Sequence, residues 1–336
     1  MIKAALIGLG KMGISHCALL GAHPEVDLVG VCDMSKLHRM AIEKYTTTPT
    51  FTDYKRMIDK QNPDCLFVVT PTKFHVEMVE YALDHNIHVF CEKPFVLNAV
   101  DGERLATKAE QRGLANQVGY HNRFLGTFRE AKRLAEKGLI GDIYHIKGEA
   151  YGPVVLKEKG DTWRSVKTEG GGCLYDYASH VINLMNFVVG PPERVGGSVM
   201  PPIFSSGVDD AVYSTFFYSD GKCGQMSVNW SDETYRKMTT QITLLGKSGK
   251  IIVDATEVKV FLREPCLEEQ LEEGWNMKYL TELSLDIDFY LRGEEYSAQV
   301  DYFIDSVKKG RVSSISSFKS AVETDFVVEM IKADAS

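Results

Sequence analysis

Three short motifs contain the residue types that bind nucleotides or transfer protons. The first occupies residues 8–13 and reads Gly-Leu-Gly-Lys-Met-Gly, directly after a short apolar run that predicts a strand. Glycines at this spacing allow a tight turn, a close approach of the backbone to a pyrophosphate, and close packing of the next helix on the strand. The free amides at the start of that helix would then bind phosphate oxygens.

An acidic residue follows the second predicted strand. Asp33 stands 20 residues after Gly13, where a carboxylate accepts hydrogen bonds from the ribose hydroxyls of a dinucleotide. Because the same negative charge repels a 2′-phosphate, the sequence favours NAD over NADP. Lys36, three residues further on, could soften that preference.

The second motif, Glu92-Lys93-Pro94, comes directly after the predicted strand 87–91. Ligands of an open α/β sheet bind outside the carboxyl ends of its strands, so Lys93 would face a bound cofactor. A desolvated lysine is a common acid or base catalyst. The motif therefore indicates Lys93 as a catalytic residue, while Pro94 would fix the backbone beside it and could adopt a cis bond.

The third motif is a run of glycines at 170–172 followed by helical periodicity, with Asp176 and His180 four residues apart. Residues at this spacing share one face of a helix. An imidazole is the usual general base for an alcohol proton, and Asp176 could hold a substrate hydroxyl or orient the ring. An Asp–His pair on a helix is also common on protein surfaces, so the pattern alone leaves both interpretations open.

The first two motifs belong to a segment in which strands and helices alternate. The predicted strands are 4–7, 26–32, 65–70 and 87–91, and the predicted helices are 36–45, 75–85 and 101–112. Strands separated by helices of this length imply right-handed crossovers and a parallel sheet that is covered on both faces.

The pattern changes near residue 122. A helical stretch at 128–137 is followed by strand-like runs, several of them alternating in polarity, at 143–151, 212–218, 224–230, 239–245, 250–253 and 258–262. These runs predict an antiparallel sheet with one face exposed or covered by a partner. Two apolar helical stripes near the C-terminus predict core contacts. The predicted fold class is α/β, with one domain at 1–121 and an α+β domain at 122–336.

Composition and charge argue against several other classes of protein. The 336-residue chain carries 38 Lys and Arg against 46 Asp and Glu, a net charge of -8, which disfavours nucleic acid or anionic membrane as a partner. Seven scattered cysteines without a Cys-x-x-Cys disfavour a disulfide framework or a metal site. We expect a cytoplasmic protein with reduced thiols and no membrane span.

In this order and spacing, the three motifs resemble those of the glucose–fructose oxidoreductase / inositol dehydrogenase (Gfo/Idh/MocA) family of NAD(P)-dependent oxidoreductases. The resemblance spans most of the chain and includes the Thr70-Pro71 turn with His75 and the segment 118–124. It implies an NAD-binding Rossmann domain followed by an α+β domain with a large, open, mostly antiparallel sheet. It also implies a homodimer or homotetramer formed through that sheet.

The resemblance assigns roles to matching positions. Lys93 corresponds to the catalytic lysine, His180 to the general acid/base, and Asp176 to its substrate-binding companion. Tyr120 and Asn122 would join these three around the substrate. The implied cofactor-binding residues are Gly8, Gly10, Lys11, Met12, Gly13, Asp33, Thr70, Pro71, His75, Glu92, Lys93, Trp163 and Arg164. No metal ligand is implied.

The sequence departs from a common form of the family at two positions. Ala178 replaces a glycine, which we interpret as a packing difference. Asn183 replaces an aspartate and so removes a carboxylate from a turn expected to face the substrate. For this reason no relative's substrate is transferred to this chain.

The resemblance implies hydride transfer between nicotinamide and a secondary alcohol of a sugar, sugar derivative or cyclitol. Two alternatives remain open. One is a redox-neutral enzyme that uses NAD transiently for epimerisation, elimination or glycoside cleavage, and the other is a non-catalytic regulator that senses NAD(P). Retention of Lys93 and His180 argues against the regulator, which needs neither residue.

Overall fold

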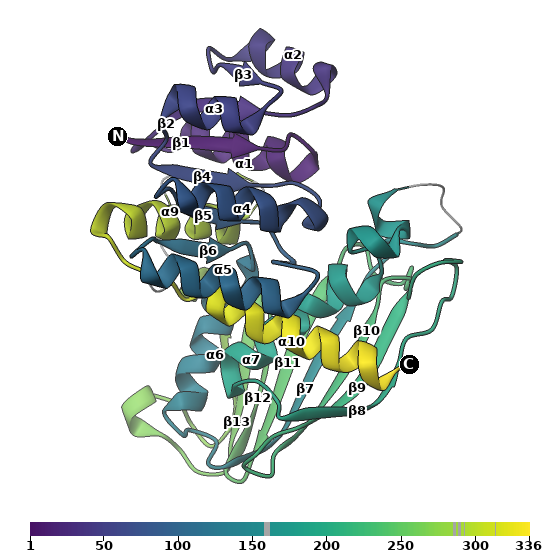
Figure 1. Ribbon diagram of the computed structural model, residues 1–336. Helices are drawn as coiled ribbons and strands as arrows, with labels where there is room; N and C mark the ends of the chain where they lie inside the picture. The colour runs from purple at the N-terminus through teal and green to yellow at the C-terminus, as the bar shows by residue number, and fades with distance from the viewer. Residues whose placement is uncertain (158–161, 285–286, 288–289, 292, 313) are drawn as a thin grey trace. The chain divides into compact units, whose positions relative to one another are not determined.

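The computed structural model describes residues 1–157, 162–284, 287, 290–291, 293–312 and 314–336 (Figure 1). The chain divides into two compact units. The first consists of 1–121 and the described residues of 286–322, and the second consists of the described residues of 122–285 together with 323–336. The described residues of 286–322 thus belong to the first unit, whereas the sequence-based boundary places all of 122–336 in a second domain.

Helix α9 (Glu294–Lys309) is the physical reason for this difference. Its apolar side, which includes Phe303 and Ile304, is buried in the core of the first unit. The Phe303 ring lies edge-on to two aromatic rings of the sheet, with centroids 5.4 Å from Phe67 and 5.8 Å from Phe90. A helical stripe predicts that one face is buried, but not which sheet will cover that face.

The first unit is built on a parallel sheet of six strands in the order β3-β2-β1-β4-β5-β6. This is the order of the dinucleotide-binding doubly wound fold, in which ligands bind at the carboxyl edge where the strand order reverses. The strands are β1 (Ile2–Ile7), β2 (Val26–Cys32), β3 (Thr50–Phe51), β4 (Cys65–Val68), β5 (His88–Cys91) and β6 (Asn116–Val118).

The crossover helices of this unit are α1 (Lys11–Ala22), α2 (Lys36–Tyr45), α3 (Tyr54–Gln61), α4 (His75–Asp84) and α5 (Ala99–Gln111). Strand β4 is buried along its whole length, which agrees with its uninterrupted apolar sequence, because strands covered on both faces carry no polar side. The predicted parallel sheet is therefore confirmed, and the three turns that follow β1, β2 and β5 lie at one edge of it.

The second unit contains a sheet of eight strands in the order β14-β13-β12-β11-β7-β10-β9-β8. All neighbours are antiparallel except β7 and β10, which are parallel. The strands are β7 (Ile143–Tyr151), β8 (Arg194–Val199), β9 (Ala211–Phe217), β10 (Cys223–Asn229), β11 (Thr239–Gly246), β12 (Gly249–Asp254), β13 (Glu257–Leu262) and β14 (Gly274–Tyr279). The mostly antiparallel sheet is also as predicted.

Helices α6 (Gly126–Glu136) and α7 (Ser179–Val189) pack on one face of this sheet. Along β11, β12 and β13 buried residues alternate with partly exposed ones, as expected of a sheet with one covered face. The chain continues through α8 (Leu280–Leu283), and α10 (Phe318–Asp334) begins in the first unit and ends in the second. Within the described residues, no helix combines the length and the apolar character needed to span a bilayer.

Candidate active site

The glycine motif joins β1 to α1 at the carboxyl edge of the first sheet. Gly8 has a φ of +97°, and a Cβ there would lie 2.2 Å from the carbonyl oxygen of Val69. A Cβ on Gly13 would lie 1.9 Å from the Gly8 carbonyl oxygen, whereas a Cβ on Gly10 would meet no described atom within 4 Å. The backbone therefore requires glycine at positions 8 and 13, while Gly10 borders open space.

The start of α1 fits the pyrophosphate of a dinucleotide. Gly10 is the N-cap residue, and no side chain in the described part of the protein caps this helix end. Amides at an uncapped helix start are available to an anionic ligand. The open space at Gly10 is where a pyrophosphate would approach the backbone. Lys11 and Met12 begin the helix, and their contacts with the cofactor remain predictions.

Replacing Gly13 with alanine should destabilise the protein by roughly 1–3 kcal/mol, because the added methyl group would overlap a backbone carbonyl. Gly21, at an exposed position of the same helix, provides a matched control, since a Cβ there meets no described atom within 4 Å. Gly21→Ala should be neutral or stabilising by about 0.5–1 kcal/mol. Urea unfolding measures both variants, and equal stabilities would contradict the packing role of Gly13.

Asp33 follows β2 and is held against the glycine loop. Its Oδ2 accepts a hydrogen bond from the Leu9 amide at 2.5 Å, and its Oδ1 accepts one from the Ser35 amide at 2.7 Å. The Arg39 guanidinium donates to the Asp33 carbonyl oxygen at 2.6 Å. These bonds hold the carboxylate beside the phosphate-binding turn, the place of a ribose-binding acid in this fold.

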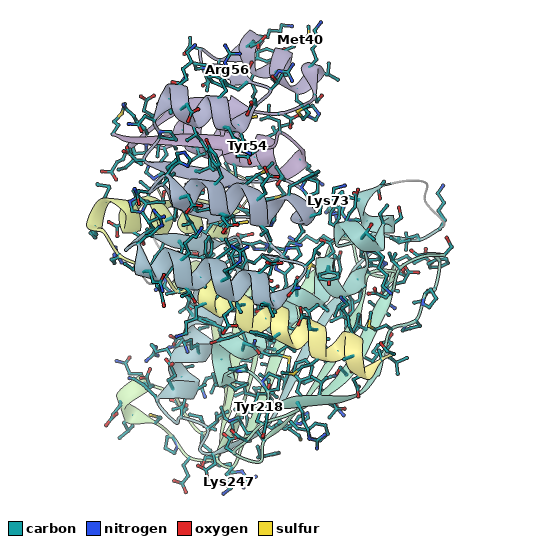
Figure 2. All side chains as sticks on the ribbon, in the orientation of Figure 1. Met40, Tyr54, Arg56, Lys73, Tyr218 and Lys247 are labelled. Carbon is teal, nitrogen blue, oxygen red and sulfur yellow. The ribbon has the colours of Figure 1, made fainter. Side chains whose placement is uncertain are left out.

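His75 begins α4 and connects two backbone segments. In its fully buried ring, Nε2 lies 2.8 Å from the Thr70 carbonyl oxygen and Nδ1 lies 3.0 Å from that of Phe95. Burial lowers the pKa of His75, and the hydrogen bonds to the carbonyls oppose that shift. The ring therefore positions the Thr70-Pro71 turn. Lys73, which is labelled in Figure 2, follows this turn. A contribution of His75 to cofactor binding would act through the turn.

The Glu-Lys-Pro motif follows β5, and its Lys93–Pro94 peptide bond is cis. The buried Glu92 carboxylate has Oε1 at 2.7 Å from Nε2 of His16, and its Oε2 accepts a hydrogen bond from the Lys93 amide at 3.1 Å. Burial by itself raises the pKa of Glu92, but the hydrogen bond and charge of His16, together with Lys93, outweigh it and leave that pKa below its ordinary value. Glu92 is thus a buried carboxylate that contacts the backbone of Lys93.

Two of the predicted substrate contacts are buried. Tyr120 is 1% exposed, and Asn122, in the 3-10 helix His121–Phe124, is 8% exposed. Tyr120 belongs to the first unit and Asn122 to the second. Their roles toward a substrate therefore remain predictions.

In the second unit, Asp176 and His180 lie on an irregular helix. Residues Leu174–Ala178 form a π-helix that continues into α7, with the Ser179 amide donating to the Leu174 carbonyl oxygen. Turns of this kind are rare and frequently occur at functional sites. Asp176 is 6% exposed and His180 is 4% exposed. The interpretation as a solvated surface pair is therefore wrong, because the structure encloses both groups.

Asp176 is paired with a predicted cofactor-binding residue. The Nε of Arg164 donates to Oδ2 of Asp176 at 2.8 Å. The guanidinium carbon of Arg164 lies 4.6 Å from the centre of the Trp163 ring, and both residues belong to the 3-10 turn Trp163–Ser165. Three residues that the sequence places at the site thus form one continuous set of contacts.

The sequence analysis does not identify Asp209, which bonds the backbone of the third motif, or its buried neighbour Asp210. Oδ2 of Asp209 accepts a hydrogen bond from the Leu174 amide at 2.7 Å, and burial raises the pKa of this carboxyl. The fully buried Asp210 accepts one from Nε1 of Trp230 at 2.6 Å. Two adjacent acidic residues directly before an apolar run are the only sequence signal that points to them.

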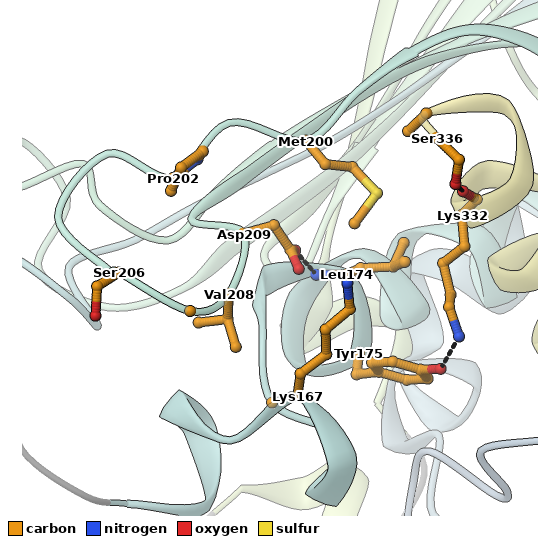
Figure 3. A pocket seen from close by; sticks show the side chains of 13 residues that line it. Lys167, Leu174, Tyr175, Met200, Pro202, Ser206, Val208, Asp209, Lys332 and Ser336 are labelled. Atoms are coloured by element: carbon orange, nitrogen blue, oxygen red, sulfur yellow. Dashed lines mark hydrogen bonds between the residues drawn. The ribbon is translucent and has the colours of Figure 1, made fainter.

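A cavity of about 410 Å³ lies next to the π-helix of the second unit (Figure 3). In its wall, the Tyr175 hydroxyl and the Lys332 Nζ are 3.0 Å apart. Neither Asp176 nor His180 is among the described residues that line it, so this cavity is not the predicted reaction centre. The described part of the chain also contains no group of three or more His, Cys, Asp or Glu side chains placed to hold a metal ion.

Asn183 is held in a buried polar network, and its position toward a substrate remains a prediction. The residue is 1% exposed, its Oδ1 accepts a hydrogen bond from Nε of Arg123 at 2.6 Å, and its Nδ2 donates to Oγ1 of Thr324 at 2.9 Å. An amide can accept from one partner and donate to another, which a carboxylate cannot do. The departure from the common aspartate is therefore explained by a buried polar network.

Comparison with known proteins defines the class to which the chain belongs. Residues 2–120 match the family described as "Oxidoreductase family, NAD-binding Rossmann fold", and residues 128–252 match the "GFO/IDH/MocA C-terminal domain". The first unit is thus the NAD-binding domain of an oxidoreductase. The chain belongs to the Gfo/Idh/MocA family, and the resemblance drawn from the three motifs is confirmed.

Individual relatives are distant in sequence. The chain is 24% identical over 325 residues to a myo-inositol 2-dehydrogenase of Thermotoga maritima, covering 94% of this chain and 91% of that protein. It is 26% identical over 275 residues to a 2,7-anhydro-N-acetylneuraminate hydratase of Escherichia coli, covering 78% of this chain and 70% of that protein. Its fold matches a levoglucosan dehydrogenase in complex with NADH, with a TM-score of 0.88, 20% identity, and coverage of 99% and 96% of the two chains.

Proposed function

We propose that the protein transfers hydride between NAD and the carbon of a secondary alcohol in a sugar, sugar derivative or cyclitol. The observation that carries this proposal is the position of Lys93, which follows β5 at the same sheet edge as the glycine loop after β1. The enclosed Asp176 and His180 of the second unit supply further polar groups suited to a hydroxylated substrate. The myo-inositol 2-dehydrogenase and levoglucosan dehydrogenase among the similar proteins support this substrate class.

Each residue has a distinct task in the proposed reaction. NAD, when bound, supplies the acceptor of the hydride. In the oxidative direction the Lys93 ammonium polarises the substrate oxygen, and a ring nitrogen of His180 takes the hydroxyl proton. The Asp176 carboxylate, held by Arg164 at 2.8 Å, accepts a hydrogen bond from a substrate hydroxyl and so orients the reacting carbon.

The direct test is NADH formation from NAD with pooled cyclitols, sugars, sugar phosphates and nucleotide sugars. We expect a rise in NADH absorbance with at least one pool, and that pool is then divided to identify the substrate. Protein that binds NADH but produces no NADH from any pool would contradict the proposal.

One relative favours a second candidate function. The similarity to 2,7-anhydro-N-acetylneuraminate hydratase supports redox-neutral conversion of a sugar with transient use of NAD. Such an enzyme would change the sugar without accumulating NADH, which product analysis of the same pools detects. Absence of both NADH and sugar products would instead favour a non-catalytic sensor.

Removing the charge of Asp33 should relax the preference for NAD. We expect Asp33→Asn to raise the ratio of kcat/KM with NADP to that with NAD by roughly tenfold or more, because hydrogen bonds to charged groups contribute about 1.5–3 kcal/mol. Asp27→Asn, at an exposed position of β2, the strand that Asp33 follows, is the control. An unchanged ratio, measured by steady-state kinetics with both cofactors, would reject the ribose-binding role of Asp33.

We propose that the uncovered face of the second sheet forms a homodimer or homotetramer. Trp275, Met277 and Tyr279 on β14 are 57%, 47% and 47% exposed. Trp275 is paired in register with Phe261, and the two ring centroids lie 5.4 Å apart. Aromatic and methionine side chains gathered on one face are typical of the buried centre of a protein interface.

A charge in this patch should weaken self-association. We expect Trp275→Glu to raise the dissociation constant of the oligomer by roughly tenfold or more, because buried aromatic residues dominate interface energies. Leu267→Glu is the control, since Leu267 is 87% exposed on the short 3-10 helix Leu267–Glu269. Light scattering after size-exclusion chromatography measures the masses, and a monomeric wild-type protein would contradict the proposal.

We also propose a cytoplasmic location and a small polyhydroxylated molecule as the partner. No disulfide joins any two cysteines in the described structure, which is typical of a reducing compartment. The net charge of -8 favours a small molecule over nucleic acid or an anionic membrane.

A further inference from the structure

We infer that His16 is a positioning residue for Lys93, which it holds in place through the buried carboxylate of Glu92. The inference rests on the catalytic role proposed for Lys93. His16 lies in α1, three residues after the last glycine of the phosphate-binding motif, whereas Glu92 follows β5. One helix would therefore position both the cofactor phosphates and, through this contact, the catalytic lysine.

The two oxygens of Glu92 have different partners. Oε1 lies 2.7 Å from Nε2 of His16, and Oε2 accepts the hydrogen bond of the Lys93 amide at 3.1 Å. His16 is completely buried, and Glu92 is 7% exposed. Two consecutive hydrogen bonds thus connect the α1 side chain to the backbone of Lys93; the first is buried and the second is partly buried.

Packing confines the carboxylate and the ring that holds it. The His16 ring centroid lies 5.1 Å from that of Phe90 and 6.0 Å from that of Phe67. On the other side, a Cβ on Gly119 would lie 2.9 Å from Oε1 and 3.0 Å from Oε2 of Glu92. The carboxylate therefore occupies space that only a glycine leaves open at position 119, and its hydrogen bond connects the orientation of Glu92 to Lys93.

Because Glu92 is charged, its hydrogen bond to the Lys93 amide depends on the presence of His16. A buried carboxylate is stable only when hydrogen bonds and nearby positive charge compensate for its lost hydration. His16 supplies such a bond from outside the Glu-Lys-Pro motif, 76 residues away in the sequence. Without it, the carboxylate must shift or take up a proton, and either change alters the bond to the Lys93 amide.

The test compares two amide replacements in the full chain. The amide nitrogen of glutamine reaches the position of the imidazole Nε2, whereas asparagine is one methylene group shorter. We expect His16→Asn to lower kcat about 10- to 100-fold while KM for NAD changes less than about threefold, because a displacement near 1 Å is enough to slow the chemical step. His16→Gln should restore most of kcat.

A second readout does not depend on turnover. Hydrogen exchange of the Lys93 amide, followed by NMR, should be about tenfold faster in His16→Asn and close to wild type in His16→Gln, because local opening controls exchange of a hydrogen-bonded amide. The Phe67 amide in β4 reports on the stability of the surrounding core. His85→Asn, at the exposed C-cap position after α4, controls for the loss of an imidazole.

The outcomes separate this inference from the proposed function. Faster exchange at Lys93 in His16→Asn, with no turnover by the wild-type protein, would support the positioning contact and reject the catalytic role. Lys93-dependent turnover by wild type, with kcat and exchange unchanged in His16→Asn, would overturn the inference alone. Equal loss of protection at Phe67 without rescue by glutamine would show a purely structural role and also overturn it. Should His16→Asn not fold, Glu92→Asp withdraws the carboxylate from His16 and should likewise lower kcat and speed exchange of the Lys93 amide; unchanged exchange in that variant would overturn the inference.

Discussion

Lys93→Met should lower kcat by roughly 10²- to 10⁴-fold, the usual contribution of a positioned acid or base. Methionine is similar in length and fills the space of the lysine side chain, but it can neither polarise the substrate oxygen nor move a proton. Binding of NADH, followed by its fluorescence, should change by less than about threefold, because this fold binds a dinucleotide mainly at the glycine loop and the acidic residue after the second strand. The substrate found in the pooled assay is used for the kinetics.

Lys60→Met provides the control for this variant, because Lys60 is an exposed lysine of α3 in the same unit. Its kcat and NADH binding should match those of the wild type. If Lys93→Met retained more than about half of the wild-type kcat, another residue would have to act on the substrate oxygen. A loss of NADH binding together with kcat would place Lys93 in cofactor binding alone.

His180→Asn should also reduce kcat by roughly 10²- to 10⁴-fold, because an amide cannot take up the hydroxyl proton. The side chain is 4% exposed, so solvent has little access to replace it. Asn resembles the Nδ1 side of the imidazole in shape and polarity and omits the rest of the ring. Steady-state kinetics in the oxidative direction, with the Arg164–Asp176 pair intact, measures the effect.

His145→Asn is the matched control within the second unit, since His145 lies on β7 in the large sheet and outside the π-helix. Wild-type kinetics are expected for it. A His180→Asn variant with unchanged kcat but an increased KM would show that His180 binds the substrate without transferring its proton. In that case Asp176 would be the next residue to test as the proton acceptor.

Much of the site could be predicted because its motifs act over short distances. The turn at Gly8 and Gly13 depends on atoms that neighbouring residues contribute, and the cis bond before Pro94 is a property of one peptide. The alternation of apolar strands and helices was sufficient to predict the parallel sheet, and the observed strand order agrees with it. The spacing of the three motifs is also a local property of the sequence. It was therefore enough to indicate the family that the family match confirms.

The enclosure of Asp176 and His180 could not be predicted in this way. Helical spacing places the two residues on one face but does not show whether solvent or protein covers it. The structure shows that both residues are buried, and that Asp176 pairs with Arg164 from a separate turn. It likewise assigns Asn183 to a buried network, where Arg123, 60 residues away, is its partner.

By itself, the sequence determined the Rossmann-type first unit, the mostly antiparallel second sheet, the use of NAD and the positions of the chemistry-bearing turns. Only the tertiary structure decided that helix α9 packs in the first unit and that His16 holds Glu92. The physical reason is the same in both cases. Periodicity and motif spacing report on a residue's neighbours along the chain, whereas the partner of a buried face or a buried charge depends on how distant segments pack.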